Sequence, residues 1–161
     1  MIQAEPGAQQ PIVAGDLVLT PVSRDLATAI VRGDLSAVVP AEGWPHDDTM
    51  DGLPGVANGP AVAWLVTLDG AVIGDCGTHG GPDGAGVIEI GYGLAAPFRG
   101  RGYGRVMVAA LAQRLLALPG ITAVLAHTEP GNAASRRVLE LAGFRYEGEE
   151  DGESRYLLPV R

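Results

Sequence analysis

The sequence predicts a single α/β domain built on one mixed β-sheet. The chain has 161 residues, which is the length of one ordinary domain. Apolar runs typical of strands alternate along it with segments that have helical periodicity. No internal repeat or long linker divides it. We expect a flexible tail over residues 1–14 and one domain over residues 15–161.

The first part of this domain is less regular than the rest. Residues 17–20 form an apolar run typical of a strand, and Ser23 is suited to cap a helix that continues to about Arg32. A second short helix is expected over residues 34–39. Residues 40–60 contain four prolines and four glycines, so we expect neither helix nor strand there. A loop of that length in a compact domain is usually functional or disordered.

The second part shows a clearer pattern. Two apolar runs are joined by Asp69-Gly70, which is a strong signal for a two-residue hairpin turn. A helix is expected to stop at Pro119-Gly120, and another to begin at Asn132 and stop at Gly143. The expected strands lie at residues 61–68, 71–76, 87–94, 121–127, 144–149 and 154–160.

Composition and charge exclude several classes of protein. The net charge is −8, so the chain lacks the clustered positive charge that nucleic acids and anionic membranes attract. No apolar run approaches the roughly 18 residues that span a bilayer, and the N-terminus does not resemble a secretory signal. Cys76 is the single cysteine, which fits a reducing cytoplasm. The sequence leaves both a monomer and a homodimer open.

A glycine-rich segment joins the strand at 87–94 directly to the following helix. Glycine lets the backbone approach a ligand closely, and the start of a helix favours an anion through its free N–H groups and its dipole. Arginines on either side can donate charge-assisted hydrogen bonds to phosphate. A turn that holds no ligand is the alternative. We expect a phosphate or pyrophosphate to bind at Arg99, Gly100, Arg101, Gly102, Tyr103, Gly104 and Arg105.

Other phosphate-binding loops do not fit the segment. A P-loop requires a lysine, and the chain contains none. A dinucleotide-binding fold carries Gly-x-Gly-x-x-Gly in its first strand–helix turn. Here the spacing is Gly-x-Gly-x-Gly, and it lies two-thirds of the way along the chain.

The pattern Arg-x-x-Gly-x-Gly at residues 99–104 resembles the coenzyme A loop of the GNAT N-acetyltransferase superfamily. Residues 89–94 and 126–140 resemble the branch related to ribosomal-protein N-terminal acetyltransferases, and Gly143-Phe144 matches the pair that ends the family's last major helix. The resemblance covers about residues 61–148. One departure is Arg105-Val106, where that branch often has Thr-Glu.

The resemblance implies a mostly antiparallel, splayed sheet flanked by helices. It also implies direct transfer of an acetyl group from acetyl-CoA to an amine, either a small molecule or a protein N-terminus. Leu94 and Ala96 should offer backbone groups to the pantetheine arm. The 99–105 loop should hold the pyrophosphate, mostly through backbone N–H groups. Asn132 and Ser135 should approach the coenzyme near the thioester.

Direct transfer needs a base for the amine and a proton for the departing thiolate. Glu89, flanked by isoleucines, and His127, whose unperturbed pKa is about 6.5, are the candidate bases. Loss of the proton to bulk water is the alternative, and both side chains also fit structural roles. Some family members have a tyrosine as the acid for the thiolate, but Leu139 stands at that position here. Ser135 is the expected substitute.

The acceptor is expected to lie against segment 40–60. In the resembling family, the segment before the central hairpin commonly walls the acceptor site. Trp44, Asp47 and Asp48, together with Asp51, suit a cationic amine, although a solvated acidic loop explains them too. Cys76 and His79 have a metal-like spacing, but no second cluster accompanies them, so we expect no metal.

Three functions remain open from the sequence. The first is an acetyl-CoA-dependent N-acetyltransferase. The second is a non-catalytic sensor that binds acyl-CoA with the same fold, because a fold does not guarantee a reaction. The third is a protein-interaction module whose acidic face binds basic partners.

Overall fold

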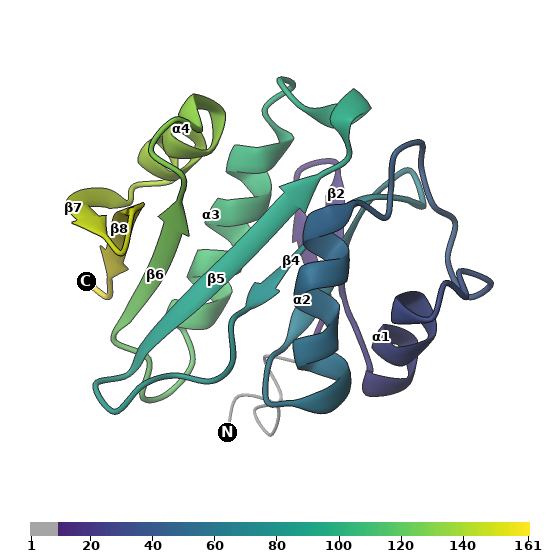
Figure 1. The fold of residues 1–161 in the computed structure, drawn as a ribbon, viewed down its shortest axis with the longest axis horizontal. Helices are drawn as coiled ribbons and strands as arrows, with labels where there is room; N and C mark the ends of the chain where they lie inside the picture. Colours follow the sequence, from purple (N-terminus) through teal and green to yellow (C-terminus); the bar gives the residue numbers. More distant parts are fainter. Residues whose placement is uncertain (1–9) are drawn as a thin grey trace.

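Eight strands form one sheet in the computed structural model, which describes residues 10–161 (Figure 1). Their order across the sheet is β1-β2-β3-β4-β5-β6-β8-β7, and among these strands of residues 10–161 only β5 and β6 pair in parallel. The mixed, mostly antiparallel sheet that we expected is therefore confirmed. The strands are β1 (Ile12–Ala14), β2 (Leu17–Pro21), β3 (Ala63–Leu68), β4 (Ala71–Thr78), β5 (Val87–Leu94), β6 (Ala123–Thr128), β7 (Arg145–Glu150) and β8 (Glu153–Pro159).

Helices cover both faces of the sheet (Figure 1). On one face lie α1 (Arg24–Val31) and α2 (Asp47–Asn58), and on the other lie α3 (Tyr103–Leu116) and α4 (Ala133–Leu141). Each helix pair closes its own hydrophobic cluster against the sheet. The sheet is therefore packed on both faces, and this packing fixes the positions of its strand ends.

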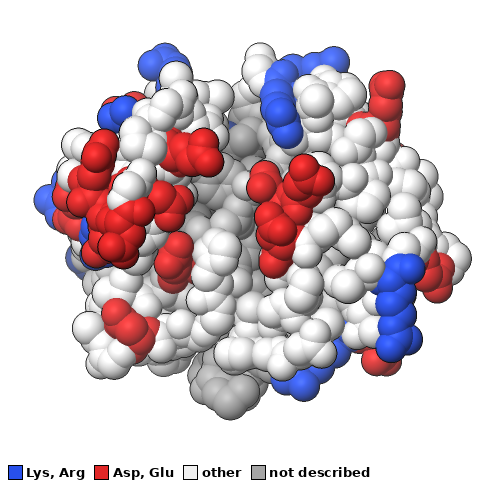
Figure 2. All heavy atoms as spheres, viewed as in Figure 1, with Lys and Arg blue, Asp and Glu red and all other residues white. Residues whose placement is uncertain are grey.

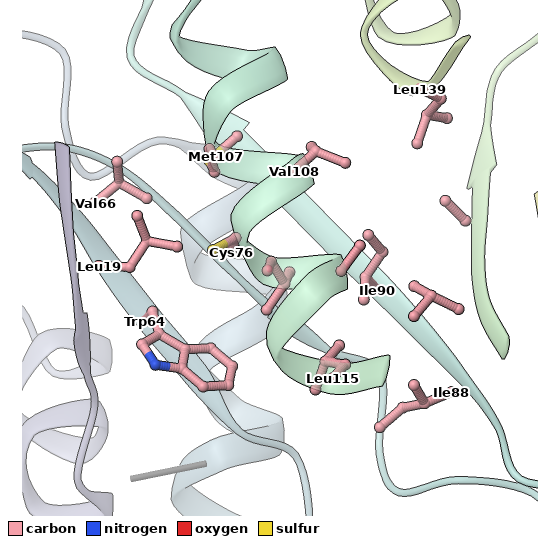
Figure 3. Close-up of a cluster of buried hydrophobic side chains, with 14 of the residues drawn as sticks. Leu19, Trp64, Val66, Cys76, Ile88, Ile90, Met107, Val108, Leu115 and Leu139 are labelled. Carbon is pink, nitrogen blue, oxygen red and sulfur yellow. The ribbon is translucent and has the colours of Figure 1, made fainter. Parts of the chain in front are cut away.

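The larger cluster lies between α3 and the sheet (Figure 3). Met107, Leu111 and Leu115 recur every four residues along α3, and all three are fully buried. This spacing places them on one face of the helix. They pack with Trp64 of β3 and Ile90 of β5, so α3 is fixed across several strands of the sheet.

Strands β5 and β6 separate at the middle of the sheet. They are paired only over Val87–Ile90 and Ala123–Ala126. Beyond that point β5 continues through Gly91–Leu94 on β4 alone, while β6 continues on β8 alone. Figure 1 shows the two strands diverging toward their carboxyl ends. The sheet is thus splayed, and the splay opens beside the start of α4.

Two predictions for the first forty residues are wrong. Residues 34–39 form turns and no helix, and residues 12–14 of the predicted tail form β1, which pairs with β2. The part of that tail over residues 1–9 lies outside the described residues. The short strand β1 needs β2 as its partner, which the apolar content of residues 12–14 alone does not reveal.

The prediction for residues 40–60 is also wrong, because α2 runs from Asp47 to Asn58 with Pro54 inside it. The helix begins with a capping box between His46 and Thr49. Thr49, Leu53 and Val56 are buried at helical spacing and face α1 and the sheet. Tertiary burial of this face outweighs the cost of the helix breakers.

Candidate active site

A cleft of about 450 Å³ lies where β5 and β6 separate. It is bounded by α2, β4, β5, the end of β6 and the start of α4. Figure 2 shows the surface hollowed between acidic residues over α2 and acidic residues over β7 and β8. The polar side chains that line the cleft include Asp48, Asp51, His79, Tyr92, His127 and Ser135.

Two glycines of β5 shape the wall below α2. A Cβ at Gly91 would lie 2.6 Å from His79 Nε2, and a Cβ at Gly93 would lie 2.7 Å from His46 Cε1. Both distances are shorter than van der Waals contact. Glycine at these positions therefore lets His79 and the first turn of α2 lie directly on the diverging strand.

The 99–105 loop forms the start of α3. Gly100 and Gly102 adopt left-handed backbone conformations, with φ of 74° and 86°. Gly102 is the N-cap, and no side chain among residues 10–161 caps this helix end. The first-turn N–H groups of α3 are thus left for a ligand, as an anion-binding helix start requires. Gly104 lies against Val138 of α4 and Leu94 at the end of β5.

The arginines around this loop have different surroundings. Arg99 Nε donates to the Leu94 carbonyl oxygen at 2.9 Å, so part of its guanidinium already serves to hold the turn. Arg101 lies over the Phe98 ring, 5.7 Å from its centroid. Arg101 and Arg105 both border a second groove, between α3 and β1. Backbone N–H groups are therefore better placed than Arg99 to hold a pyrophosphate.

At the start of α4, Asn132 caps the helix by accepting a hydrogen bond from the Ser135 backbone N–H at 3.0 Å. The Ser135 hydroxyl lies 2.6 Å from the Tyr92 hydroxyl on β5. Burial raises the pKa of Tyr92 to about 12. Both hydroxyls border the cleft, so the predicted residue Ser135 has a partner that the sequence did not reveal.

His127 is held between two carboxylates. Its Nδ1 lies 3.1 Å from Glu89 Oε2, and its Nε2 lies 2.8 Å from Glu150 Oε1. Burial opposes protonation of this histidine, but Glu89 and Glu150 outweigh burial and raise its pKa. The pKa of His127 therefore lies above the usual value for histidine. Arg155 binds Glu150 in turn, at 3.2 Å, so Glu150 joins His127 to a charged group on β8.

The pKa of His127 gives a testable pH dependence. A histidine whose pKa is raised on folding stabilises the fold below its unfolded value of about 6.5, and this stabilisation is lost as pH rises through the folded pKa. We expect Glu150→Gln to lower the His127 pKa measured by NMR titration. It should also reduce the melting temperature more at pH 6 than at pH 9. Glu149→Gln, on the neighbouring exposed residue, is the control; equal effects from both variants would contradict the assignment.

Trp44 does not border the cleft, so the prediction that it covers the acceptor is wrong. Trp44 is 4% exposed and packs in the cluster that α1 and α2 close against the sheet. Its Nε1 donates to Asp75 Oδ2 at 2.9 Å, and the Thr49 hydroxyl donates to the same oxygen. Asp75 is 8% exposed, and desolvation by burial raises its pKa. This carboxylate ties α2 to β4 beneath the cleft.

Of the predicted acidic acceptor residues, Asp48 borders the cleft and Asp47, which is exposed, does not. Asp51, three residues after Asp48 on α2, borders it as well. The sequence did not indicate which of these carboxylates face the cleft, because α2 was not expected there. The residues that the sequence missed are Asp75, Tyr92 and Glu150. The sequence shows an Ile-Gly-Tyr-Gly segment in the predicted strand, but it does not show that Tyr92 of this segment contacts Ser135 across the splay.

Two further observations bear on predicted absences. Within residues 10–161, no helix is long and apolar enough to cross a membrane. No group of three or more potential metal ligands occurs in that range either. The absence of a metal stays a prediction.

Several acetyltransferases of known structure have a fold similar to that of this chain. RimJ from Mycobacterium smegmatis, solved with a CoA disulfide, is 22% identical, with a TM-score of 0.68 over 97% of this chain and 90% of that one. RimL, a ribosomal alpha-N-protein acetyltransferase solved with coenzyme A, is 18% identical, with a TM-score of 0.69 over 94% and 98%.

The aminoglycoside acetyltransferase AAC(6')-Ib, solved with coenzyme A and kanamycin, is 23% identical, with a TM-score of 0.65 over 89% and 94%. At these identities the likeness shows the fold. No curated protein matched the chain. Residues 16–145 match the acetyltransferase (GNAT) domain family. Because this match covers most of the chain, the protein belongs to the GNAT acetyltransferase family.

Proposed function

We propose that the protein transfers an acetyl group from acetyl-CoA directly to an amine bound in the cleft. The observation that carries this proposal is the splay of β5 and β6 next to an uncapped start of α3. The splayed strand offers free backbone groups to an extended ligand, and the helix start offers N–H groups to an anion. Family membership and coenzyme complexes of the neighbours support the same assignment.

The coenzyme is proposed to lie along the carboxyl end of β5, from the start of α3 to the start of α4. Its pyrophosphate would lie on residues 99–105, mostly on backbone N–H groups, and its pantetheine arm would follow Leu94 and Ala96. The thioester would then reach the start of α4. Asn132 and Ser135 lie there, and Ser135 borders the cleft together with His127. Coenzyme and amine would thus meet at the splay.

His127 is the proposed base, with Glu89 orienting its ring. Glu89 does not border the cleft, whereas His127 does. Both ring nitrogens contact carboxylates, so a substrate amine must displace one of them. Glu150 is the one to move, because its side chain is 48% exposed and can turn to solvent. The neutral ring takes the proton, so turnover should rise with pH as His127 deprotonates.

The acceptor is proposed to be a cationic amine. The charged side chains that border the cleft are acidic or histidine, and arginine is absent from this wall within residues 10–161. Carboxylates concentrate a protonated amine near the site. They also favour the form that cannot attack, which is why a base near the thioester is useful.

We expect Asp48→Asn and Asp51→Asn to raise the KM for the amine by about three- to tenfold each, since each removes one attractive charge. The KM for acetyl-CoA should change little. Asp47→Asn is the matched control, because it removes the same charge from the same helical turn outside the cleft. If all three variants raise the KM for the amine equally, the overall negative charge of the protein attracts the amine, and the carboxylates in the cleft have no special role.

Acetyl-CoA-dependent thiol release tests the function, with a panel of polyamines, aminoglycosides and peptides with free N-termini. Release that depends on one class of amine, with the acetylated product seen by mass spectrometry, supports the proposal. Coenzyme binding without transfer to any amine would favour the acyl-CoA sensor. No coenzyme binding would leave the interaction module.

A further inference from the structure

Tyr92 and Ser135 bring two hydroxyl groups together at the base of the cleft. Tyr92 lies on β5 beyond the point where β6 leaves it, and Ser135 lies in the first turn of α4. Their oxygens are 2.6 Å apart, and either can be the donor. The Tyr92 ring is half-buried against the main core cluster, which fixes its hydroxyl in place. The Ser135 backbone is fixed by its bond to Asn132.

A pair of hydroxyls can pass a proton without gaining charge, because one proton leaves at one end as another enters at the other. Burial raises the pKa of Tyr92 to about 12, so Tyr92 stays protonated at neutral pH. Neither hydroxyl is then a net acid or base. The pair is suited to moving a proton between two other groups.

The proposed reaction requires such a transfer. When a neutral amine attacks the thioester carbonyl, the N–C bond forms, the C–S bond breaks, and sulfur leaves with the bonding electron pair. The nitrogen then carries one proton too many, and the sulfur needs one. His127 removes the earlier proton of the ammonium form, so this second proton needs its own route.

We propose that Ser135 and Tyr92 form this route as a hydroxyl relay. Ser135 donates its proton to the departing sulfur and receives one from Tyr92 in the same step. Tyr92 recovers the proton that the nitrogen releases, directly or through one water. Atoms and charge balance, because one proton has moved from nitrogen to sulfur. Ser135 is the catalytic residue, and Tyr92 is a positioning residue that acts through it. The inference rests on the proposed function.

The thiol of bound coenzyme A is the probe, and it needs no acceptor. Thiolate absorbance, followed against pH at saturating coenzyme A, reports how strongly the site stabilises the sulfur anion. We expect the midpoint for the wild-type complex to lie below that of free coenzyme A. Ser135→Ala should raise this midpoint by about one pH unit, because the thiolate loses one hydrogen bond. Tyr92→Phe should raise it part of the way.

Three further variants separate the relay from packing. Ser135→Thr keeps a hydroxyl and should titrate like the wild type. The double variant should match Ser135→Ala alone, because Tyr92 acts only through Ser135. Tyr146→Phe removes a hydroxyl from a tyrosine that is 48% exposed on β7, and should have no effect. Circular dichroism confirms that each variant is folded.

The outcomes are distinct. Absence of calorimetric binding of coenzyme A to the wild type would overturn the proposed function itself. If folded Tyr92→Phe binds coenzyme A normally and the bound thiol titrates with the wild-type midpoint, the relay is overturned. The proposed function is not affected by that result. Additive shifts in the double variant would also overturn it, since two hydroxyls acting independently do not form a relay.

Discussion

Replacing Gly102 by leucine should lower the affinity for acetyl-CoA by about tenfold to a hundredfold. Gly102 is the N-cap of α3 and has a φ of 86°. A leucine there strains the backbone by about 1–2 kcal/mol, and relief of that strain would turn the first-turn N–H groups away from the ligand. Its side chain would also enter the space that the pyrophosphate is proposed to fill. Isothermal titration calorimetry measures the effect.

Gly120→Leu is the matched control. Gly120 has a φ of 84°, and a Cβ added there would meet no atom within 4 Å, as is also true at Gly102. It lies beyond the opposite end of α3, so it should cost similar stability without changing coenzyme affinity. Equal loss of affinity in both variants would mean that strain, not the site, is responsible. Unchanged affinity in Gly102→Leu would remove the loop from the coenzyme site.

Asp75→Ala should lower the free energy of unfolding by about 3 kcal/mol. It leaves the Trp44 indole N–H and the Thr49 hydroxyl without their shared acceptor in a buried setting, and each such orphaned group costs about 1–3 kcal/mol. For a protein of this size the melting temperature should fall by about 10 °C. Urea denaturation gives the free energy. Asp75→Asn keeps one carbonyl oxygen and should lose less.

Asp83→Ala tests whether the loss of stability expected for Asp75→Ala arises because the hydrogen-bonded groups around Asp75 are buried. Asp83 Oδ1 also accepts two hydrogen bonds, from the backbone N–H groups of Ala85 and Val87, but in an exposed loop. Water can replace that acceptor, so the loss should stay below about 1 kcal/mol. If Asp83→Ala costs as much as Asp75→Ala, the buried carboxylate does not specially hold α2 on β4.

The parts of the fold that the sequence predicts are those governed by local signals. Ser23 and Asn132 cap their helices as expected, and β5 has the predicted bounds. Each depends on residues within a few positions of one another. Helix α2 depends instead on burial of Leu53 and Val56 against α1 and the sheet, and no local rule outweighs its proline and glycines.

The features of the site also separate into those that local sequence determines and those that depend on the tertiary fold. The glycine loop is a local pattern, and its left-handed glycines appear where the sequence places them. The protonation state of His127 depends on Glu150, 23 positions away across the sheet, and the partner of Ser135 is 43 positions away. A sequence names such residues one at a time, but only the strand register brings them together.

An amide NMR titration with acetyl-CoA tests whether the splay and the start of α3 hold the coenzyme. We expect the largest chemical-shift changes at residues 99–105, 91–96 and 132–135, with little change along β1 and β2. Changes confined to β1 and to residues 106–117, with none at residues 99–105, or no saturable change at all, would contradict it.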